Sequence, residues 1–408
     1  MALAGVVVTA FTLRLAVSGV SPVLGRITED LHLRPAEAGV LAMMPSLGFA
    51  LTGILTTLAM RRVGLEALLI ISCVLAAAGT IARALTTGDV GFVVLTFVTM
   101  CGLGMGNVVL PPVIKKYFPH RIAALSALYS MLLGMSTATA PFFAVPLADA
   151  AGWRVSVGSW AVFSLAALLP WLVLWVGAGR GSRRPPAEQT PDLTVLPDAV
   201  VAPATTARVK PWHSRIGWGV VLMFTGTSAN TFSMFLWLPR FLTDTGFSEH
   251  TAGLMLSYYA ILAVPVSFAV PFLVRRFGNT VVLGLSTVAL YALGYLAVLL
   301  WPHAQWGGFE LIWVWITVFA LAQASFPLSI TLINARTRTT AGAGSLSGFG
   351  QGLGYLAGSL GPLVFGLLFG ATGSWWPSFG YLWLMLLVLS GGILLTGRHR
   401  FMEDDAAR

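Results

Sequence analysis

The sequence predicts an all-α membrane protein in which twelve transmembrane helices form two pseudo-symmetric six-helix bundles. Three observations predict this class. Hydrophobic residues make up 57% of the 408 residues and charged residues only 10%, too few polar side chains to cover a water-soluble surface. The apolar residues form long runs separated by basic loops, and the two halves of the chain resemble each other. A soluble enzyme is therefore excluded.

The apolar runs have the length that a bilayer requires. A helix needs about 20 mostly apolar residues to cross a hydrocarbon core about 30 Å thick. Runs of this kind occupy, in order, residues 2–25, 38–60, 67–86, 90–114, 122–148, 155–177, 217–239, 251–274, 280–300, 309–334, 343–370 and 377–396. The first run has no basic segment before it and contains Arg14, so it is interpreted as a spanning helix and not as a signal peptide.

The distribution of basic residues predicts the orientation. With the N-terminus inside, 18 of the 24 Lys and Arg residues fall on the cytoplasmic side. Arg14 lies inside the first run, and the outer side has Arg26, Arg34, Arg83, Arg154 and Arg240. We therefore expect both termini to be cytoplasmic, in the inner (plasma) membrane. The net charge of +9 is explained by topology, so no nucleic-acid partner is expected. The lipid bilayer and a small-molecule substrate are the expected partners of a functional monomer.

A polar, proline-rich segment over residues 178–216 divides the chain. It predicts an N-terminal six-helix bundle over 1–177, a cytoplasmic linker over 178–216, a C-terminal six-helix bundle over 217–397 and a cytoplasmic tail over 398–408. The two bundles are also related in sequence. A shift of 214 residues places Gly39 on Gly253, Arg61 and Arg62 on Arg275 and Arg276, and Gly64 on Gly278, and a shift of 221 places Pro141 on Pro362 and Gly152 on Gly373. Two parallel repeats of six helices are characteristic of carriers with a central site.

The loops after the second helix of each half contain Arg61-Arg62-Val63-Gly64 and Arg275-Arg276-Phe277-Gly278. They resemble reduced forms of the major facilitator loop motif, in which basic residues meet helix ends and acidic partners on the cytoplasmic face. Such a motif implies a gating role for Arg61, Arg62, Arg275 and Arg276. The alternative is simple positive-inside anchoring, and the usual acidic residue before the arginine pair is absent here.

Several further stretches resemble the cyanate permease and nitroimidazole transporter branch of the major facilitator superfamily. They include Leu13-Arg14 with Ser21-Pro22, Gly106-Asn107-Val108-Val109-Leu110-Pro111, Leu128-Tyr129, Gly152-Trp153-Arg154, Trp237-Leu238-Pro239, Phe326-Pro327-Leu328, Gln351 and Gly354-Tyr355. This resemblance implies the major facilitator fold and a secondary transporter that works by alternating access around a midplane site. The chain departs from the family pattern at Thr12 and at Ala322-Gln323-Ala324-Ser325. A substrate could contact these positions, so the family's substrate is not assigned to this chain.

Arg14 is the most informative candidate for the site. At about 1.5 Å per residue it lies roughly 18 Å into the first helix, close to the bilayer centre, where an unpaired guanidinium is costly. Helical spacing places Phe11, Ser18 and Ser21 on its face. Two hydroxyls and an arginine suit a wet cavity that accepts an anion. The alternative is an arginine that helix-end carbonyls and water satisfy, and that holds the bundle together.

Other polar residues lie at plausible depth in the spans. These are Asn107, Tyr129, Asn230, Tyr258, Gln323, Gln351 and Tyr355. For each of them, hydrogen bonding between helices is as good an explanation as substrate contact. Asn107, Tyr129 and Gln351 rank highest, because they also match the family pattern. Carboxylates are scarce, and Glu310 is the only candidate for proton coupling, with an interfacial position as its alternative.

Glycines spaced by four residues predict smooth helix faces for close packing, first at Gly102 and Gly106 and again at Gly350, Gly354 and Gly358. No metal, nucleophile or phosphate site emerges, so no catalysis and no cofactor are expected. The sequence as a whole predicts a secondary transporter for a small anionic or nitro-bearing solute. The alternatives are a multidrug-type efflux carrier for neutral or cationic compounds and, from another class, a transporter-like membrane sensor.

Overall fold

The computed structural model describes residues 1–180, 211–338, 340–397 and 401–405. The expected linker over 178–216 lies largely outside the described residues, as do 398–400 and 406–408 of the expected tail. The prediction of an all-α protein is confirmed, since the described chain is helical apart from a short hairpin of two-residue strands. A bilayer favours this outcome, because a helix satisfies its backbone hydrogen bonds within one segment.

The first half of the chain forms one bundle and the second half another. The first consists of α1 (Ala2–Ser18), η1 (Ser21–Val23), α2 (Leu24–Leu31), α3 (Pro35–Val63), α4 (Leu65–Leu85), α5 (Asp89–Tyr117), η2 (Pro119–Arg121), α6 (Ile122–Ser159) and α7 (Ala161–Arg180). The second consists of η4 (Pro211–His213), α8 (Arg215–Asp244), α9 (Glu249–Phe277), α10 (Thr280–Leu300), β1 (Gln305–Trp306), β2 (Phe309–Glu310), α11 (Ile312–Leu321), η5 (Ala322–Ala324), α12 (Ser325–Ala335), α13 (Thr340–Gly358), α14 (Leu360–Thr372), α15 (Trp375–Gly397) and α16 (Met402–Asp405).

Ten segments of the described chain are long and apolar enough to cross a membrane. The segment Met131–Gly177 contains residues 131–148 of the predicted span 122–148 and the whole of the predicted span 155–177. The predicted span 38–60 lies in α3. Gly152, at φ 84°, interrupts α6 between those two predicted spans, so the chain turns there although the helix continues on both sides. The span expected over 309–334 begins later, at Ile312, because residues 305–310 form the hairpin.

The glycines that end the two basic motifs have a common structural role. Gly64 has φ 86° and ends α3, while Gly278 has φ 66° and ends α9. Side chains other than hydrogen rarely tolerate such values, so glycine at these positions stops the helix where the chain must leave the membrane. The repeated Arg-Arg-X-Gly motif therefore marks the end of an equivalent helix in each half of the chain.

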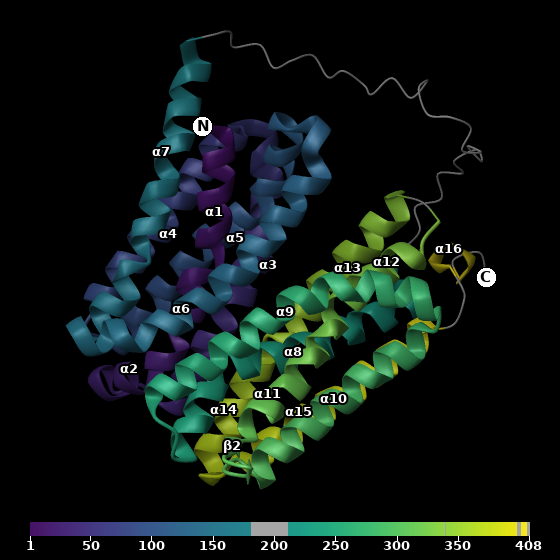
Figure 1. The fold of residues 1–408 in the computed structure, drawn as a ribbon. Helices are drawn as coiled ribbons and strands as arrows, with labels where there is room; N and C mark the ends of the chain where they lie inside the picture. The colour runs from purple at the N-terminus through teal and green to yellow at the C-terminus, as the bar shows by residue number, and fades with distance from the viewer. Residues whose placement is uncertain (181–210, 339, 398–400, 406–408) are drawn as a thin grey trace.

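The two bundles meet at one end and diverge toward the end where the N-terminus and the last turn of α7 lie (Figure 1). Related glycines lie at the contact. A side-chain carbon on Gly39 of α3 would lie 3.0 Å from Leu363 of α14, and one on Gly253 of α9 would lie 3.0 Å from the carbonyl oxygen of Pro141 in α6. Each bundle therefore presents an equivalent glycine to the other, which is what pseudo-symmetric halves require.

The predicted glycine faces are confirmed. A side-chain carbon on Gly102 would lie 2.5 Å from the backbone nitrogen of Ala76 in α4. On α13, the same carbon on Gly350, Gly354 or Gly358 would lie 2.4–2.6 Å from side-chain atoms of α8. The absence of side chains allows these helix backbones to approach closely, which favours van der Waals packing between helices in a membrane.

The end of the described chain packs back onto the second bundle. Met402 of α16 is fully buried in a cluster that includes Ile216 and Leu346. Its backbone N–H donates to the carbonyl of Arg336 at 2.9 Å, and Arg338 forms an ion pair with Asp404 at 3.0 Å. Residues 401–405 of the expected tail are therefore part of the folded bundle.

Candidate functional site

A cavity of about 500 Å³ lies between the two bundles. This volume falls in the range typical of small-molecule sites. The first bundle contributes residues of α1, α3, α4, α5 and α6 to its wall, and the second contributes residues of α8, α9, η5, α12 and α13. A ligand in this cavity therefore touches both halves of the protein.

Arg14 of α1 lines the cavity and is half-buried. Its guanidinium lies over the ring of Phe49, 5.3 Å from the centroid. It also lies within electrostatic reach of the hydroxyls of Tyr129 and Tyr355. Among the described residues no ion pair involves Arg14, and no Asp or Glu side chain lines the cavity. The positive charge of this wall is therefore not neutralised by a neighbouring carboxylate.

Four other expected residues join Arg14 in the wall. Ser18 donates its hydroxyl to the carbonyl of Arg14 at 3.0 Å, one helical turn back. Ser21 donates to the carbonyl of Leu236 at 2.8 Å and so connects the first bundle to α8 of the second. Gln323 donates to the carbonyl of Tyr259 at 2.9 Å, and Tyr355 packs edge-on against Phe224. The expected set is thus brought together only in part.

The remaining candidates lie outside the cavity wall and have partners of their own. Tyr129 donates its hydroxyl to Asn107, and Tyr258 shares a hydrogen bond of 2.7 Å with Thr317. Gln351 donates to Ser347 at 2.6 Å, within the same helix. Phe11 packs against Phe163, with ring centroids 5.5 Å apart, and Asn230 is fully buried and donates to the carbonyl of Gly226. For these six positions the structure provides packing and interhelical or local hydrogen bonds.

Glu310 does not meet the condition that made it a candidate for proton coupling. The carboxyl had to be buried in a span, but Glu310 is exposed in strand β2 of the hairpin that precedes α11. The apolar run that suggested a helix from residue 309 includes the end of this hairpin, and the turn at Gly307 and Gly308 places the strand outside the helix. Glu310 therefore lacks the burial that proton coupling was expected to require.

Arg83 is the cavity residue that the sequence analysis misplaced. It was expected on the outer face, because it lies close to the end of its apolar run. In the structure its side chain has no exposed surface, belongs to the cavity wall and donates through Nη2 to the carbonyl of Ala16 at 2.9 Å. The sequence feature that identified Arg14 is also present at Arg83. It too is a basic residue with apolar residues on both sides, Ile81-Ala82 and Ala84-Leu85.

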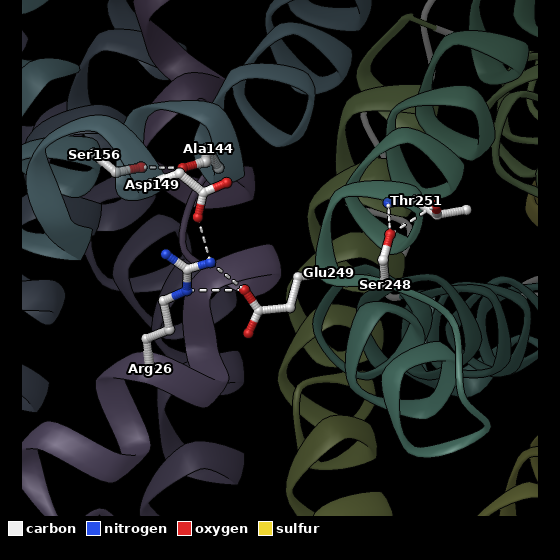
Figure 2. Close-up of polar contacts among 7 residues, drawn as sticks. All are labelled: Arg26, Ala144, Asp149, Ser156, Ser248, Glu249 and Thr251. Carbon is white, nitrogen blue, oxygen red and sulfur yellow. Dashed lines mark hydrogen bonds and ion pairs between the residues drawn. The ribbon is translucent and has the colours of Figure 1, made fainter.

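The two bundles are joined beyond the cavity by a network of charged residues (Figure 2). Arg26 of α2 lies between Asp149 of α6, at 2.6 Å, and Glu249 of α9, to which its Nε donates at 2.8 Å. Arg154 forms a separate ion pair with Asp30 at 2.7 Å, within the first bundle. The Arg26 network links the two halves at the end where they meet.

The basic motif loops lie away from the cavity. Arg62, Arg275 and Arg276 are exposed, and no ion pair found among the described residues includes any of them. The side chain of Arg61 lies outside the described residues. Near this end, Glu66 accepts hydrogen bonds from Lys116 and Tyr117, both at 2.6 Å. Burial and this bond to a carboxylate raise the pKa of the Tyr117 hydroxyl above its ordinary value.

Comparisons with known proteins agree with this architecture. A family model described as Major Facilitator Superfamily matches residues 6–362. The uncharacterized transporter YycB of Bacillus subtilis (strain 168) is 28% identical over 403 residues, which cover 98% of this chain and 94% of that protein. The 2-nitroimidazole transporter of Escherichia coli (strain K12) is 29% identical over 405 residues, which cover 98% and 95%.

Solved structures resemble this one in fold. A bacterial homolog of the human lysosomal transporter Spinster, in an inward-facing and unoccupied conformation, has a TM-score of 0.74 at 16% identity, with 99% of this chain and 97% of that chain covered. A D-xylose-proton symporter has a TM-score of 0.73 at 14% identity, with 98% of each chain covered. At these identities the likeness establishes the fold and no more.

Proposed function

The chain belongs to the major facilitator superfamily and is a multi-pass membrane transporter, not an enzyme, and on this premise we propose that it moves a small anionic or nitro-bearing solute by alternating access. One observation carries the proposal. Arg14 presents a guanidinium to a cavity shared by both halves, and no carboxylate among the described lining residues neutralises it. A guanidinium in low-dielectric surroundings favours a ligand that brings negative charge or strong acceptor oxygens.

The neighbouring groups support the same class of solute. Ser18, Ser21 and Gln323 add polar side chains to the wall, and Phe232, Phe235 and Phe326 add aromatic surface. A nitro group has two acceptor oxygens in one plane, as a carboxylate has, and the Escherichia coli relative is named for 2-nitroimidazole transport. The same chemistry therefore accommodates an anion and a flat nitro compound.

The orientation and the moving parts are also part of the proposal. Both termini are cytoplasmic, as the basic loops require, and the end of the cavity closed by Arg26 faces outward. The structure then corresponds to an inward-open carrier that functions as a monomer in the plasma membrane. Residues 1–177 and 217–397 are the two units that rock about the cavity, so that it opens to one side at a time.

The first prediction tests the role of Arg14. Thermal stability of the purified protein is measured with small anions, 2-nitroimidazole and organic cations, for the wild type and for Arg14→Ala. A ligand that binds the folded state raises stability in proportion to occupancy. We expect anions or the nitro compound to stabilise the wild type, and Arg14→Ala to weaken that binding by about tenfold or more, because a charged hydrogen bond is lost.

The control is Arg336→Met, which alters a buried arginine outside the cavity wall and leaves Arg14 in place. Ligand binding should survive in that variant. If neutral or cationic compounds stabilise the wild type and Arg14→Ala equally, Arg14 is structural and an efflux carrier for such compounds replaces this proposal. If a ligand binds but no flux follows in proteoliposomes, the protein is a transporter-like sensor.

A further inference from the structure

Arg83 is a buried cation with incomplete hydrogen bonding. Its guanidinium has five N–H donors and carries a permanent positive charge. Nη2 donates to the carbonyl of Ala16, whereas Nε and Nη1 are buried and have no acceptor among the described residues. A buried charge in this condition is destabilising unless a further group satisfies it.

The position of Arg83 indicates which group could do so. Arg83 lies in the wall of the same cavity as Arg14, and its one acceptor, Ala16, lies in the same wall two residues after Arg14. Thr96 of α5 also lines the cavity, and its hydroxyl is likewise buried without a partner. Arg83 and Thr96 of the first bundle therefore both line the cavity with unsatisfied donors, and Arg14 of the same bundle lines it too.

The opposite wall has a different character. The second bundle contributes no charged side chain to the described lining. It contributes the neutral hydroxyls of Thr227 and Ser228, which are also buried without a partner. It also contributes aromatic rings, those of Phe232, Phe235, Phe268, Phe326 and Tyr355. Among the described lining residues, the cationic side chains thus belong to the first bundle and the aromatic rings to the second, which also contributes polar side chains such as Gln323.

We propose that Arg83 is a second solute-contacting residue, and that Arg14 and Arg83 together hold the oxyanion of a small aromatic carboxylate whose ring lies against the second bundle. This inference rests on the proposed function and narrows its substrate class. It assigns the charge of the solute to one half of the protein and the apolar body to the other. A solute that lacks either part loses the contacts which that part makes with its half of the protein, so both parts are needed for tight binding.

The test uses benzoate as the probe, with benzamide as its neutral counterpart and formate as an anion without a ring. Dissociation constants are obtained from thermal stabilisation of the full chain in detergent, for the wild type, Arg83→Met, Arg83→Lys and Arg14→Ala. We expect wild-type affinity for benzoate to exceed that for formate and benzamide. Arg83→Met should weaken benzoate binding by about tenfold or more and leave benzamide unchanged.

Arg83→Lys guards against a variant that fails to fold, because it keeps the charge and loses the planar donors. It should bind benzoate more weakly than the wild type and benzamide equally well. Arg336→Met is again the matched control and should bind both probes like the wild type. Thermal stability without ligand reports the structural contribution of each arginine separately.

The outcomes separate this inference from the function on which it rests. Benzoate binding that is lost in Arg14→Ala and unchanged in both Arg83 variants would make Arg83 structural and leave the anion carrier standing. Formate binding as tight as benzoate binding would overturn the aromatic part of the assignment. If neither anion nor 2-nitroimidazole stabilises the wild type, the proposed function fails, and this inference fails with it.

Discussion

Tyr129 and Asn107 show how a polar residue inside a membrane helix can be structural. The two side chains bond to each other between α6 and α5, and neither lines the cavity. In a bilayer such a bond is favourable mainly because water is not available as the alternative partner. The family pattern had ranked both residues among the foremost candidates, so their role is worth separating from that of the cavity residues.

Tyr129→Phe should lower stability without changing solute affinity. The substitution removes the hydroxyl and leaves the Asn107 oxygen without this donor, a loss of about 0.5–1.5 kcal/mol. The measurement is the midpoint of thermal unfolding together with the dissociation constant for benzoate or 2-nitroimidazole. Tyr355→Phe is the matched control, since Tyr355 lines the cavity and its loss should alter affinity. An affinity change in Tyr129→Phe at unchanged stability would assign Tyr129 to the site.

Helix α13 packs against α8 along a face of glycines, while other glycines of the same helix face open space. A side-chain carbon on Gly354 would lie 2.4 Å from the Cβ of Phe224, and one on Gly352 would meet nothing within 4 Å. The two positions differ by two residues and therefore point to different sides of the helix. This difference makes α13 a natural place to measure what close packing contributes.

Gly354→Ala should destabilise the protein by about 1–3 kcal/mol, because the added methyl overlaps atoms that have little room to move. Gly352→Ala in the same helix should be neutral or stabilising by up to about 1 kcal/mol, since alanine is the better helix former and meets no neighbour. The measurement is the midpoint of thermal unfolding of each variant, compared with that of the wild type. Equal effects would mean that glycine content, and not the contact with α8, sets the stability of α13.

Among the described residues, few polar contacts join the two halves at the end where they meet. Arg26 connects α2 to Glu249 of α9, and Ser21 connects η1 to Leu236 of α8. The Arg26 side chain is 31% exposed and that of Glu249 is 38% exposed, so water weakens the ion pair. Contacts of this strength can hold a closed end without preventing it from opening, which is what a rocking carrier needs.

Arg26→Ala should shift the population toward molecules that are open at this end, by several-fold, because each exposed ion pair contributes about 0.2–1 kcal/mol. Spin labels at Glu29→Cys and His250→Cys, in a background without Cys73 and Cys101, would report the distance across the end. We expect longer distances to gain weight. Arg34→Ala is the control, because Arg34 pairs only with nearby Glu37 in the ion pairs described. Unchanged distances in Arg26→Ala would show that apolar packing alone closes this end.

The sequence by itself determined the class of protein and most helix positions. Apolar length identified the spanning segments, and the repeat of Gly64 and Gly278 marked equivalent helix ends. It also identified Arg14 as a candidate, because a basic residue within an apolar run can be recognised without knowing how the helices pack. These features are local, since hydrophobicity and backbone conformation depend on neighbours along the chain.

Only the tertiary structure decided which residues share the cavity. Sequence position placed Arg83 near a membrane surface, but in the fold its side chain is fully buried in the cavity wall and donates to the carbonyl of Ala16 in α1. Asn107 of α5 and Tyr129 of α6 lie toward each other, and Glu310 lies outside the helices, in β2. A polar side chain at membrane depth must find a partner, and which partner it finds depends on helices that are distant in the chain.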